Sequence, residues 1–213
     1  MKVTNFMLSI LATFAIGVAT AATTLPITTH PTSVIQVPAD NGVKGGGLII
    51  NLPKNPTHTQ ADVLAIAYRT AKKDGHKHPE LLQGILLQES KAGGLSSYKV
   101  AGQEFGLTVN KRYYGIGQLK VSAAKDVLNR YPSMWREFGF QTRTDEEIIA
   151  KLIENDAFNI SIASKYLLIL QSQGAGSSPQ QLAAAYNQGV AGAEAGKGLG
   201  YSRAVMQHIA RLN

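Results

Sequence analysis

The chain has 213 residues, of which 44% are hydrophobic and none is cysteine, and it carries a formal net charge of +7 at pH 7. This length allows one domain with a sizeable core plus additional segments. The lack of cysteine excludes disulfides, thiolate metal sites and a cysteine nucleophile. The positive charge is typical of proteins with an anionic partner, but Lys and Arg occur in runs no longer than two, so we predict no nucleic-acid interface.

Residues 1–21 have the pattern of an export signal. Lys2 supplies a positive start, residues 6–18 are mostly apolar, and residues 19–21 (Ala-Thr-Ala) give the small-x-small pattern that precedes a cleavage point. The apolar run is short for a transmembrane span. We therefore expect a protein exported to the periplasm or extracellular space, with no stable membrane insertion after signal removal. An uncleaved membrane anchor is the alternative.

Residues 22–58 are rich in Thr, Pro, Gly and Val. Prolines recur along this segment and rule out a helix of useful length. We interpret it as an N-terminal arm or linker. The remainder, 59–213, is predicted to be one mainly all-α domain.

The first predicted helix covers 59–73 and stops at Gly75. Its inward face should carry the residues that share helical spacing, namely Ala61, Leu64, Ala65, Tyr68 and Ala71. His76 and His78 follow, and their spacing matches no metal-binding motif. We therefore expect a solvated loop here and no metal site.

The second predicted helix, 79–90, carries the most unusual residue of the chain, Glu89. Leu82, Ile85, Leu86 and Glu89 stand at i, i+3, i+4 and i+7 and share one face. A carboxylate on an apolar stripe, near the negative end of a helix dipole, is disfavoured against its neutral acid. The helix therefore predicts a Glu89 protonated near neutral pH, as a general acid requires. The alternative is a solvated residue where the helix emerges from the protein.

Residues 91–112 are glycine-rich and polar, which predicts an irregular loop or small hairpin. In the tight segment that follows, 113–118 (YYGIGQ), two glycines allow a close backbone approach. Ser122 is the predicted cap of a helix that runs to about Arg130.

The longest predicted helical stretch opens at Thr144 with a T-x-x-E capping box and continues to residue 170, with a kink near Asn155. It is largely apolar, so we expect it to be the central core helix. Another helix should run from Ser178 to Gly189. The last should run over 201–212, with Val205, Ile209 and Leu212 facing inward.

Three short stretches place polar groups beside glycine or at a helix end. They are residues 88–90 (QES), 115–118 (GIGQ) and 185–189 (AYNQG). Singly, the glycine loop could be a plain turn and Tyr186 a core tyrosine. Together, their order resembles the soluble lytic transglycosylase family of the lysozyme superfamily, whose members carry an E-S pair at a helix end, a G-L-M-Q loop and an A-Y-N-x-G helix end. Asn159-Ile160 and Tyr166-Leu167 are similar to a further family pattern, N-I-x-x-G-x-x-Y-L.

The resemblance implies a lysozyme-like helical domain over 59–213, with the loop or hairpin at its active-site cleft. It implies a peptidoglycan lytic transglycosylase that cleaves the bond between N-acetylmuramic acid and N-acetylglucosamine and forms 1,6-anhydromuramic acid. Glu89 matches the single catalytic acid/base, and Tyr186 matches the tyrosine that hydrogen-bonds it. The positions matched to the substrate groove are Ser90, Gly115, Ile116, Gly117, Gln118, Tyr186, Asn187 and Tyr201.

No cofactor is implied. The implied partners are peptidoglycan glycan strands, and the resemblance leaves room for a partner in the cell-envelope machinery.

The loop departs from the family, since Gly117 stands where methionine is usual and Tyr114 where a small residue is frequent. Two alternatives stay open. Glu104, between the motifs, could serve a hydrolytic enzyme similar to goose-type lysozyme. The altered loop could also belong to a peptidoglycan-binding structural protein that does not cleave.

Overall fold

The computed structural model of the chain describes residues 60–95, 99–102 and 107–212. The chain divides into two units, Met1–Leu48 and Ile49–Asn213, and every described residue belongs to the second. The predicted export signal (1–21) and the arm (22–58) lie outside the described residues. Of the described part, 67% is helix and 3% strand, which confirms the predicted mainly all-α fold.

The helices and strands follow one another through the second unit. The first elements are α1 (Gln60–Lys73), α2 (Glu80–Ser90), β1 (Val100–Ala101), the 3-10 helix η1 (Val109–Lys111), β2 (Tyr113–Tyr114) and α3 (Val121–Arg130). The remaining elements are α4 (Ser133–Glu137), α5 (Asp145–Glu154), α6 (Asp156–Ser172), α7 (Pro179–Glu194) and α8 (Leu199–Ala210). Over the described ranges, no helix has the length and apolar character needed to cross a membrane.

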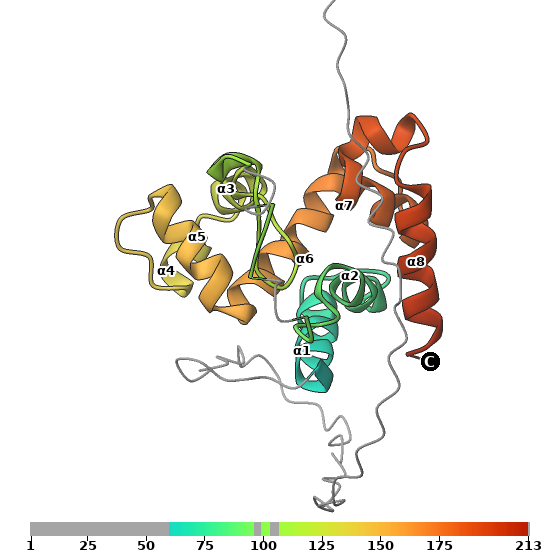
Figure 1. Ribbon diagram of the computed structural model, residues 1–213, viewed down its shortest axis with the longest axis horizontal. Coiled ribbons are helices and arrows are strands. Elements are labelled where there is room, and N and C mark those ends of the chain that lie inside the picture. The colour runs from blue at the N-terminus through green and yellow to red at the C-terminus, as the bar shows by residue number, and fades with distance from the viewer. Residues whose placement is uncertain (1–59, 96–98, 103–106, 213) are drawn as a thin grey trace, which may run out of the picture. The chain divides into compact units, whose positions relative to one another are not determined.

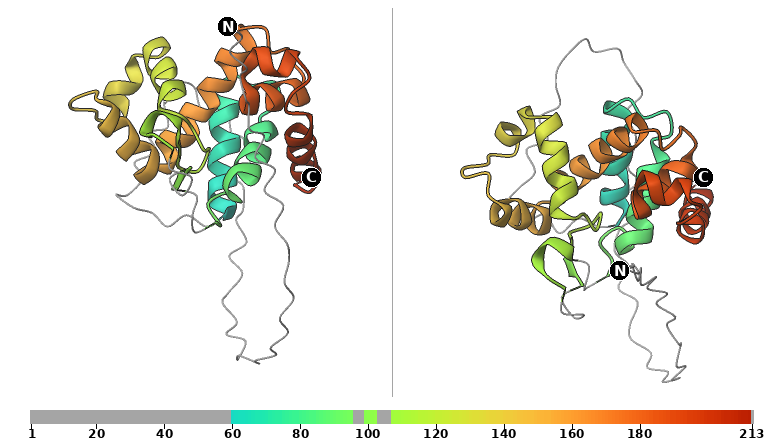
Figure 2. Two further views of the ribbon diagram at one scale, coloured as in Figure 1. Left: turned by 45° about the horizontal axis from the view of Figure 1, so that its top comes forward. Right: turned by 90° about the horizontal axis from the view of Figure 1, so that it is seen from above.

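Helix α6 lies between two groups of helices. Figures 1 and 2 show α3, α4 and α5 on one side of it and α1, α2, α7 and α8 on the other. It packs against α1, α3, α5 and α7, and its buried residues include Phe158, Ile160 and Leu167. A helix that is apolar on nearly all sides has to be surrounded by other elements. The predicted central core helix is therefore confirmed.

The predicted stretch from Thr144 to residue 170 is two helices rather than one kinked helix. Asn155 leaves the helical conformation (φ −125°, ψ 93°), ends α5 and caps α6. Its side-chain Oδ1 accepts a hydrogen bond from the backbone N–H of Phe158 at 2.9 Å. A side-chain amide that satisfies an N-terminal N–H favours a new helix start over continuation of the old one.

The sequence predicts an irregular loop or small hairpin over 91–112, after α2, and a hairpin forms there whose second strand lies just beyond that range. Strands β1 and β2 pair antiparallel, with Val100 opposite Tyr114 and Ala101 opposite Tyr113. Tyr114 and Leu119 then exchange backbone hydrogen bonds of 2.9 and 3.1 Å. These bonds close the tight loop between them, which contains the GIGQ motif.

Two predicted apolar faces are wrong in detail. In α1 the buried residues are Val63, Ile66, Ala67 and Ala71, whereas Tyr68 is 39% exposed. Burial of Val63 and Ile66 removes more apolar surface from water than burial of the predicted Ala61 and Ala65 would. Of the predicted face, Ala71 is buried as expected and Leu64 is half-buried. Of the residues predicted to face inward on α8, Val205 is buried and Ile209 half-buried, whereas Leu212 lies beyond the helix end and is exposed.

The predicted cap at Ser122 is also wrong. Helix α3 begins one residue earlier, at Val121, after Lys120, which makes no side-chain capping hydrogen bond. Val121 is buried and Ser122 is exposed. Burial of the apolar residue in the first turn therefore places the helix start, and the nearby hydroxyl does not.

The loop after α1 is not simply solvated, because His76 is tied to α6. Its Nε2 lies 3.1 Å from both Oγ and the backbone oxygen of Ser164. Ser164 Oγ donates to Asp74 Oδ2 at 2.6 Å, and Lys165 Nζ lies 2.6 Å from Asp74 Oδ1. Burial lowers the pKa of His76 below its usual value. This polar cluster fixes the end of α1 against the central helix.

Only half of the predicted capping box forms at the start of α5. Thr144 Oγ1 accepts from the N–H of Glu147 at 3.3 Å. The Glu147 carboxylate reaches back past the cap and accepts from the N–H groups of Gln141, Thr142 and Arg143 at 2.7, 2.8 and 2.9 Å. These bonds, that of Gln141 foremost, lower the pKa of Glu147 to about 2.

The Glu147 carboxylate should make the fold sensitive to acid. Because its folded-state pKa is lowered, its stabilising effect is present above the unfolded pKa, near 4.5, and is lost as the pH falls towards about 2. Urea unfolding followed by circular dichroism from pH 6 to pH 2 should show this loss in the wild type and a smaller one in Glu147→Gln. Glu146→Gln, an exposed neighbour in the same turn, is the matched control. Identical acid profiles for wild type and Glu147→Gln would contradict the assignment.

Candidate active site

Helix α2 carries Glu89 on a face that is otherwise buried. Its other members at helical spacing, Leu82, Ile85 and Leu86, are each 0% exposed, so the predicted apolar stripe is confirmed. The helix ends at Lys91, whose left-handed conformation (φ 54°) directs its N–H to the last carbonyls of the helix. Glu89 therefore stands in the last turn of α2, on the same face that anchors this helix in the core.

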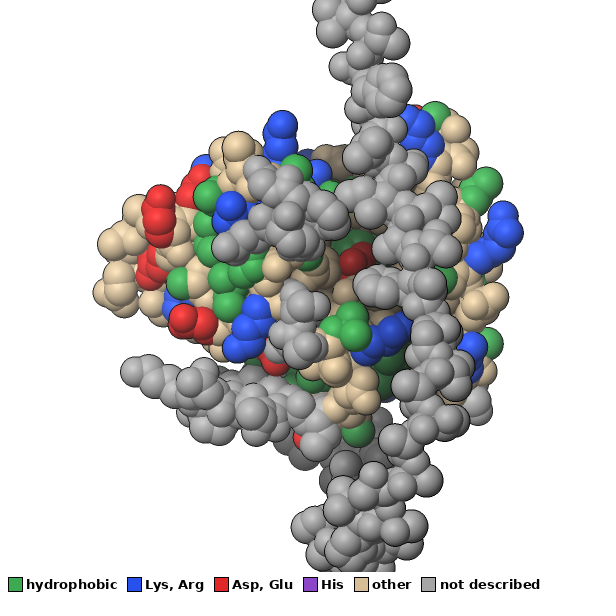
Figure 3. Space-filling view, in the orientation of Figure 1, with side chains coloured by type: hydrophobic (Ala, Val, Ile, Leu, Met, Phe, Trp, Pro, Cys, Tyr) green, Lys and Arg blue, Asp and Glu red, His purple; other side chains and the backbone are tan. Residues whose placement is uncertain are grey.

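The Glu89 carboxyl group lies against α8. Its Oε1 accepts a 2.6 Å hydrogen bond from the Tyr201 hydroxyl. Burial raises the pKa of Glu89 from 4.5 to about 7, and the bond from Tyr201 opposes this rise. The residue still keeps some accessible surface. The predicted protonated glutamate near neutral pH agrees with this environment, with burial as the dominant cause. Figure 3 shows Lys and Arg side chains scattered over the described part of the face in view rather than gathered in one patch.

Two tyrosines near Glu89 have exchanged the roles that the resemblance implied. Tyr201, expected only as one of the groove residues, donates the hydrogen bond to the carboxyl. Tyr186, expected as that donor, instead donates to the backbone oxygen of Gly117 at 2.7 Å. Tyr186 is nevertheless close enough for the charge of Glu89 to contribute to the rise of its pKa. The expectation for Tyr186 is corrected accordingly: it positions the loop, and Tyr201 holds the acid.

One buried amide holds the GIGQ loop in place. Asn159, on α6, is 0% exposed. Its Oδ1 accepts from the N–H of Gly117 at 2.8 Å, and its Nδ2 donates to the backbone oxygens of Tyr114 and Leu152 at 2.9 and 3.0 Å. Its side chain thus uses both donors and its acceptor inside the protein. Together with Tyr186, it fixes the loop on both sides of Gly117.

The loop has room for no side chain at either glycine. A Cβ at Gly115 would lie 1.9 Å from the backbone oxygen of Leu152 and 2.2 Å from Asn159 Nδ2. A Cβ at Gly117 would lie 2.9 Å from Asn159 Oδ1 and 3.1 Å from the Tyr186 hydroxyl. Gly117, which stands where the family usually has methionine, is therefore required by the close approach of two side chains.

Two residues predicted to contact substrate are turned into the protein. Ser90 is 0% exposed, donates from Oγ to the carbonyl of Leu86 at 3.2 Å, and accepts from the N–H of Gly93 at 3.1 Å. Ile116 is also 0% exposed and belongs to the hydrophobic core. Their placement corrects the expectation. Ser90 stabilises the end of α2, and Ile116 anchors the loop.

Gly115, Gly117 and Tyr186 are buried as well, which corrects their predicted contact with substrate. The remaining predicted groove residues, Gln118, Asn187 and Tyr201, keep accessible surface. Gln118 is half-buried in a left-handed conformation (φ 47°), and its Nε2 donates to the carbonyl of Gly115 at 2.8 Å. Asn187 is exposed, one residue beyond Tyr186 and just before Gly189, where α7 bends (φ 72°, ψ 168°). Gln118 and Asn187 therefore differ from the buried members of the predicted set in keeping surface that a ligand can reach.

Sequence reasoning missed Asn159 as a site residue, although its motif had been noted. The available signal was an amide in the middle of an otherwise apolar helix, since a buried polar group must find partners. Within the part of the chain that the structure describes, no cluster of three or more His, Asp or Glu could hold a metal ion.

The close approach of Gly115 to the backbone of Leu152 can be tested by comparing two glycine-to-alanine variants. Gly115 and Gly139 both have positive φ (69° and 64°), but a Cβ at Gly139 would meet nothing within 4 Å. Gly139→Ala should cost about 1–2 kcal/mol from left-handed strain alone. Gly115→Ala should cost at least about 3 kcal/mol because it adds a backbone clash. Urea unfolding measures both, and equal losses would show that the loop does not approach α5 as described.

The assignment of Tyr201 as the hydrogen-bond donor can be tested by titration. Tyr201→Phe removes a bond that stabilises the charged carboxylate, so the pKa of Glu89 should rise above about 7. Tyr186→Phe retains that bond and should change the pKa less. Carbon-13 NMR of the labelled Glu89 carboxyl gives both values. An equal change in the two variants, or a fall in Tyr201→Phe, would count against the assignment.

Comparison with known proteins places the chain in no family. No protein-family model, no curated protein and no solved structure matches it. A functional assignment must therefore be carried by the residues and geometry around Glu89.

Proposed function

We propose that this chain is a peptidoglycan lytic transglycosylase with Glu89 as its single catalytic acid/base. The observation that carries the proposal is a recessed glutamate with a pKa of about 7, held by the hydroxyl of Tyr201 at 2.6 Å. A general acid works best when its pKa lies near the working pH, and raising a carboxyl into this range by burial is a recurring device of enzymes that cleave glycans.

The first step uses Glu89 as an acid. Because Tyr201 donates to Oε1, Oε2 is the oxygen left to hold and transfer the proton. Oε2–H protonates the glycosidic oxygen between N-acetylmuramic acid and N-acetylglucosamine, and the bond from that oxygen to C1 of the muramyl sugar breaks. The N-acetylglucosamine side leaves as an alcohol, and C1 acquires oxocarbenium character.

The second step uses the same group as a base. The Glu89 carboxylate accepts the proton of the C6 hydroxyl of the muramyl sugar, and O6 bonds to C1 to close the 1,6-anhydro ring. Glu89 ends protonated, as it began, and no water is consumed. The substrate's own hydroxyl thus takes the place of the second carboxylate that most glycosidases need.

The loop beside Glu89 supports a sugar-binding role. It is held by Asn159 and Tyr186, so its polar groups need little ordering when a ligand binds. Gln118 and Asn187 supply amides that can bond sugar hydroxyl and acetamido groups.

The expected location and the net charge of the protein fit a cell-wall substrate. We propose that residues 1–21 direct export to the periplasm or extracellular space, and that the positive charge favours a wall polymer rich in peptide carboxylates.

The proposal predicts that Glu89→Gln loses nearly all release of soluble fragments from purified peptidoglycan, at least about a thousandfold, because the amide cannot donate the proton. Its fold should be intact. A carboxyl with a raised pKa stabilises less as the pH rises from about 4.5 to about 7, so at pH 8 the variant should be more stable than the wild type, by up to about 3 kcal/mol. Glu80→Gln, at the other end of α2, should retain activity. Retained activity in Glu89→Gln would refute the assignment of the acid.

The released fragments distinguish this reaction from hydrolysis. Anhydro ends are lighter by one water than reducing ends, so mass spectrometry separates them. The proposal predicts anhydro ends. Only reducing ends would indicate a hydrolase, for which Glu104, outside the described residues, is the second acid to test. Binding to the polymer without any fragment release would indicate a structural protein.

A further inference from the structure

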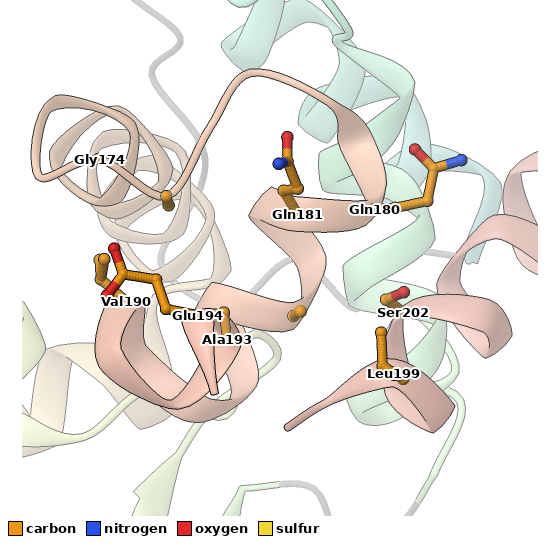
Figure 4. Close-up of a pocket in the computed structure, with 10 residues that line it drawn as sticks. Gly174, Gln180, Gln181, Val190, Ala193, Glu194, Leu199 and Ser202 are labelled. Carbon is orange, nitrogen blue, oxygen red and sulfur yellow. The ribbon is translucent and has the colours of Figure 1, made fainter. Parts of the chain in front are cut away.

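A pocket of about 170 Å³ lies at the bend of α7, formed by residues other than those around Glu89. Its walls come from the turn before α7, from both parts of α7 on either side of Gly189, and from the start of α8. Figure 4 shows Glu194 on one side of the pocket and Ser202 with Leu199 on the other. A space of this size accepts one small organic group rather than a glycan strand.

Most of the wall is apolar. Ala175, Ala184, Val190, Ala193 and Leu199 line it, and their side chains offer only aliphatic contacts. An aliphatic chain of a few carbons would gain from leaving water here. The alanines of the wall have short side chains, and this leaves the pocket open.

Among the polar groups of the pocket, Gln181 is engaged in the capping box with Ser178, whereas Ser202 and Glu194 show no side-chain partner among the described residues. Ser202 is only 4% exposed, and across the described ranges its hydroxyl makes no hydrogen bond. A buried hydroxyl without a partner is costly, so a ligand that bonds it removes a penalty the free protein carries. Glu194 lines the opposite side and forms no ion pair with any described residue, although the chain as a whole has a net charge of +7.

We propose that this pocket binds a peptide through a lysine-like side chain. The primary ammonium would face Glu194, the aliphatic stem would lie along the alanine, valine and leucine walls, and an amide of the peptide would bond the Ser202 hydroxyl. Long amines bury their stems on apolar surface and keep the charged head at a polar edge, and a hydroxyl can serve as donor or acceptor for an amide. The inference does not depend on the chemistry proposed for Glu89.

The test titrates the full chain with three matched probes, followed by backbone amide chemical shifts of the residues that line the pocket. Nα-acetyl-lysine-N-methylamide carries all three features, Nα-acetyl-norleucine-N-methylamide lacks the ammonium, and n-butylamine lacks the amides. The lysine probe should bind most tightly. The norleucine probe should bind about tenfold or more weakly, because a charge-assisted hydrogen bond is lost. The butylamine should bind several-fold more weakly.

Three variants assign the binding to this pocket. Glu194→Gln, at an exposed position, should reduce the lysine probe's affinity to about that of norleucine. Ser202→Ala should weaken binding several-fold yet leave the free protein at least as stable, since it removes an unpartnered hydroxyl. Ala193→Leu should weaken all probes by filling the space.

Equal binding of the lysine and norleucine probes would overturn the ammonium site, as would shifts that do not involve the pocket residues. Absence of saturable binding would overturn the pocket as a site altogether. A loss of stability in Ser202→Ala would show that the hydroxyl has a structural partner and would remove it from the proposal. None of these outcomes bears on Glu89, so the two proposals fail separately.

Discussion

The candidate site depends on one buried side chain, the amide of Asn159. Three backbone segments meet at it: the end of the hairpin at Tyr114, the loop at Gly117 and the end of α5 at Leu152. The carbonyl of Tyr114 also accepts from the backbone N–H of Leu119, whereas the N–H of Gly117 is paired by Asn159. A buried N–H left unpaired would cost about 1–3 kcal/mol. The amide supplies a donor or an acceptor to each. The loop can therefore be both irregular and buried, and both glycines follow from how closely it approaches the amide.

Two opposing effects decide the state of Glu89. Burial disfavours its charge, whereas the hydroxyl of Tyr201 favours it, and the pKa of about 7 means that burial prevails. The same burial, with the negative charge of Glu89, raises the pKa of Tyr201 well above 10. The phenol therefore keeps its proton and donates it in the hydrogen bond to the Glu89 carboxylate. This asymmetry assigns the roles: the tyrosine orients the acid, and the acid alone exchanges a proton near neutral pH.

Local sequence patterns predicted the positions of the helices well, but they predicted poorly which side chains of distant segments contact one another. The stripe of Leu82, Ile85 and Leu86 identified the buried face of α2, and with it the unusual position of Glu89, because helical spacing is a property of the segment alone. The cap at Thr144 and the start of α7 at Ser178 are local for the same reason. The mainly helical fold and the small hairpin could therefore be predicted before any long-range contact was known.

The errors concern contacts between segments far apart in the chain. Which of two tyrosines reaches Glu89 depends on how α7 and α8 pack on α2, and no local pattern encodes that distance. Ser90 and Ile116 belong to short motifs, but adjacent residues on a helix end or in a tight loop point in different directions, so a motif can combine functional and structural members. Asn159 was visible only as a polar residue in an apolar helix. Its importance lies in three partners, of which two are more than 40 residues away in the chain.

The distance between α8 and α2 decides whether the hydroxyl of Tyr201 can bond Glu89. Helix α8 packs closely on α2 because Gly84 has no side chain: a Cβ there would lie 2.7 Å from Ile209 Cγ1 and 3.0 Å from the carbonyl of Val205. At its other end α8 starts at Gly198, where a Cβ would lie 3.1 Å from the carbonyl of Ala184 on α7. Two glycines thus let α8 approach both neighbours. A hydrogen bond of 2.6 Å tolerates little separation, whereas apolar contacts between helices tolerate more. The hydrogen bond from Tyr201 to Glu89 therefore depends on the close approach of α8 to α2.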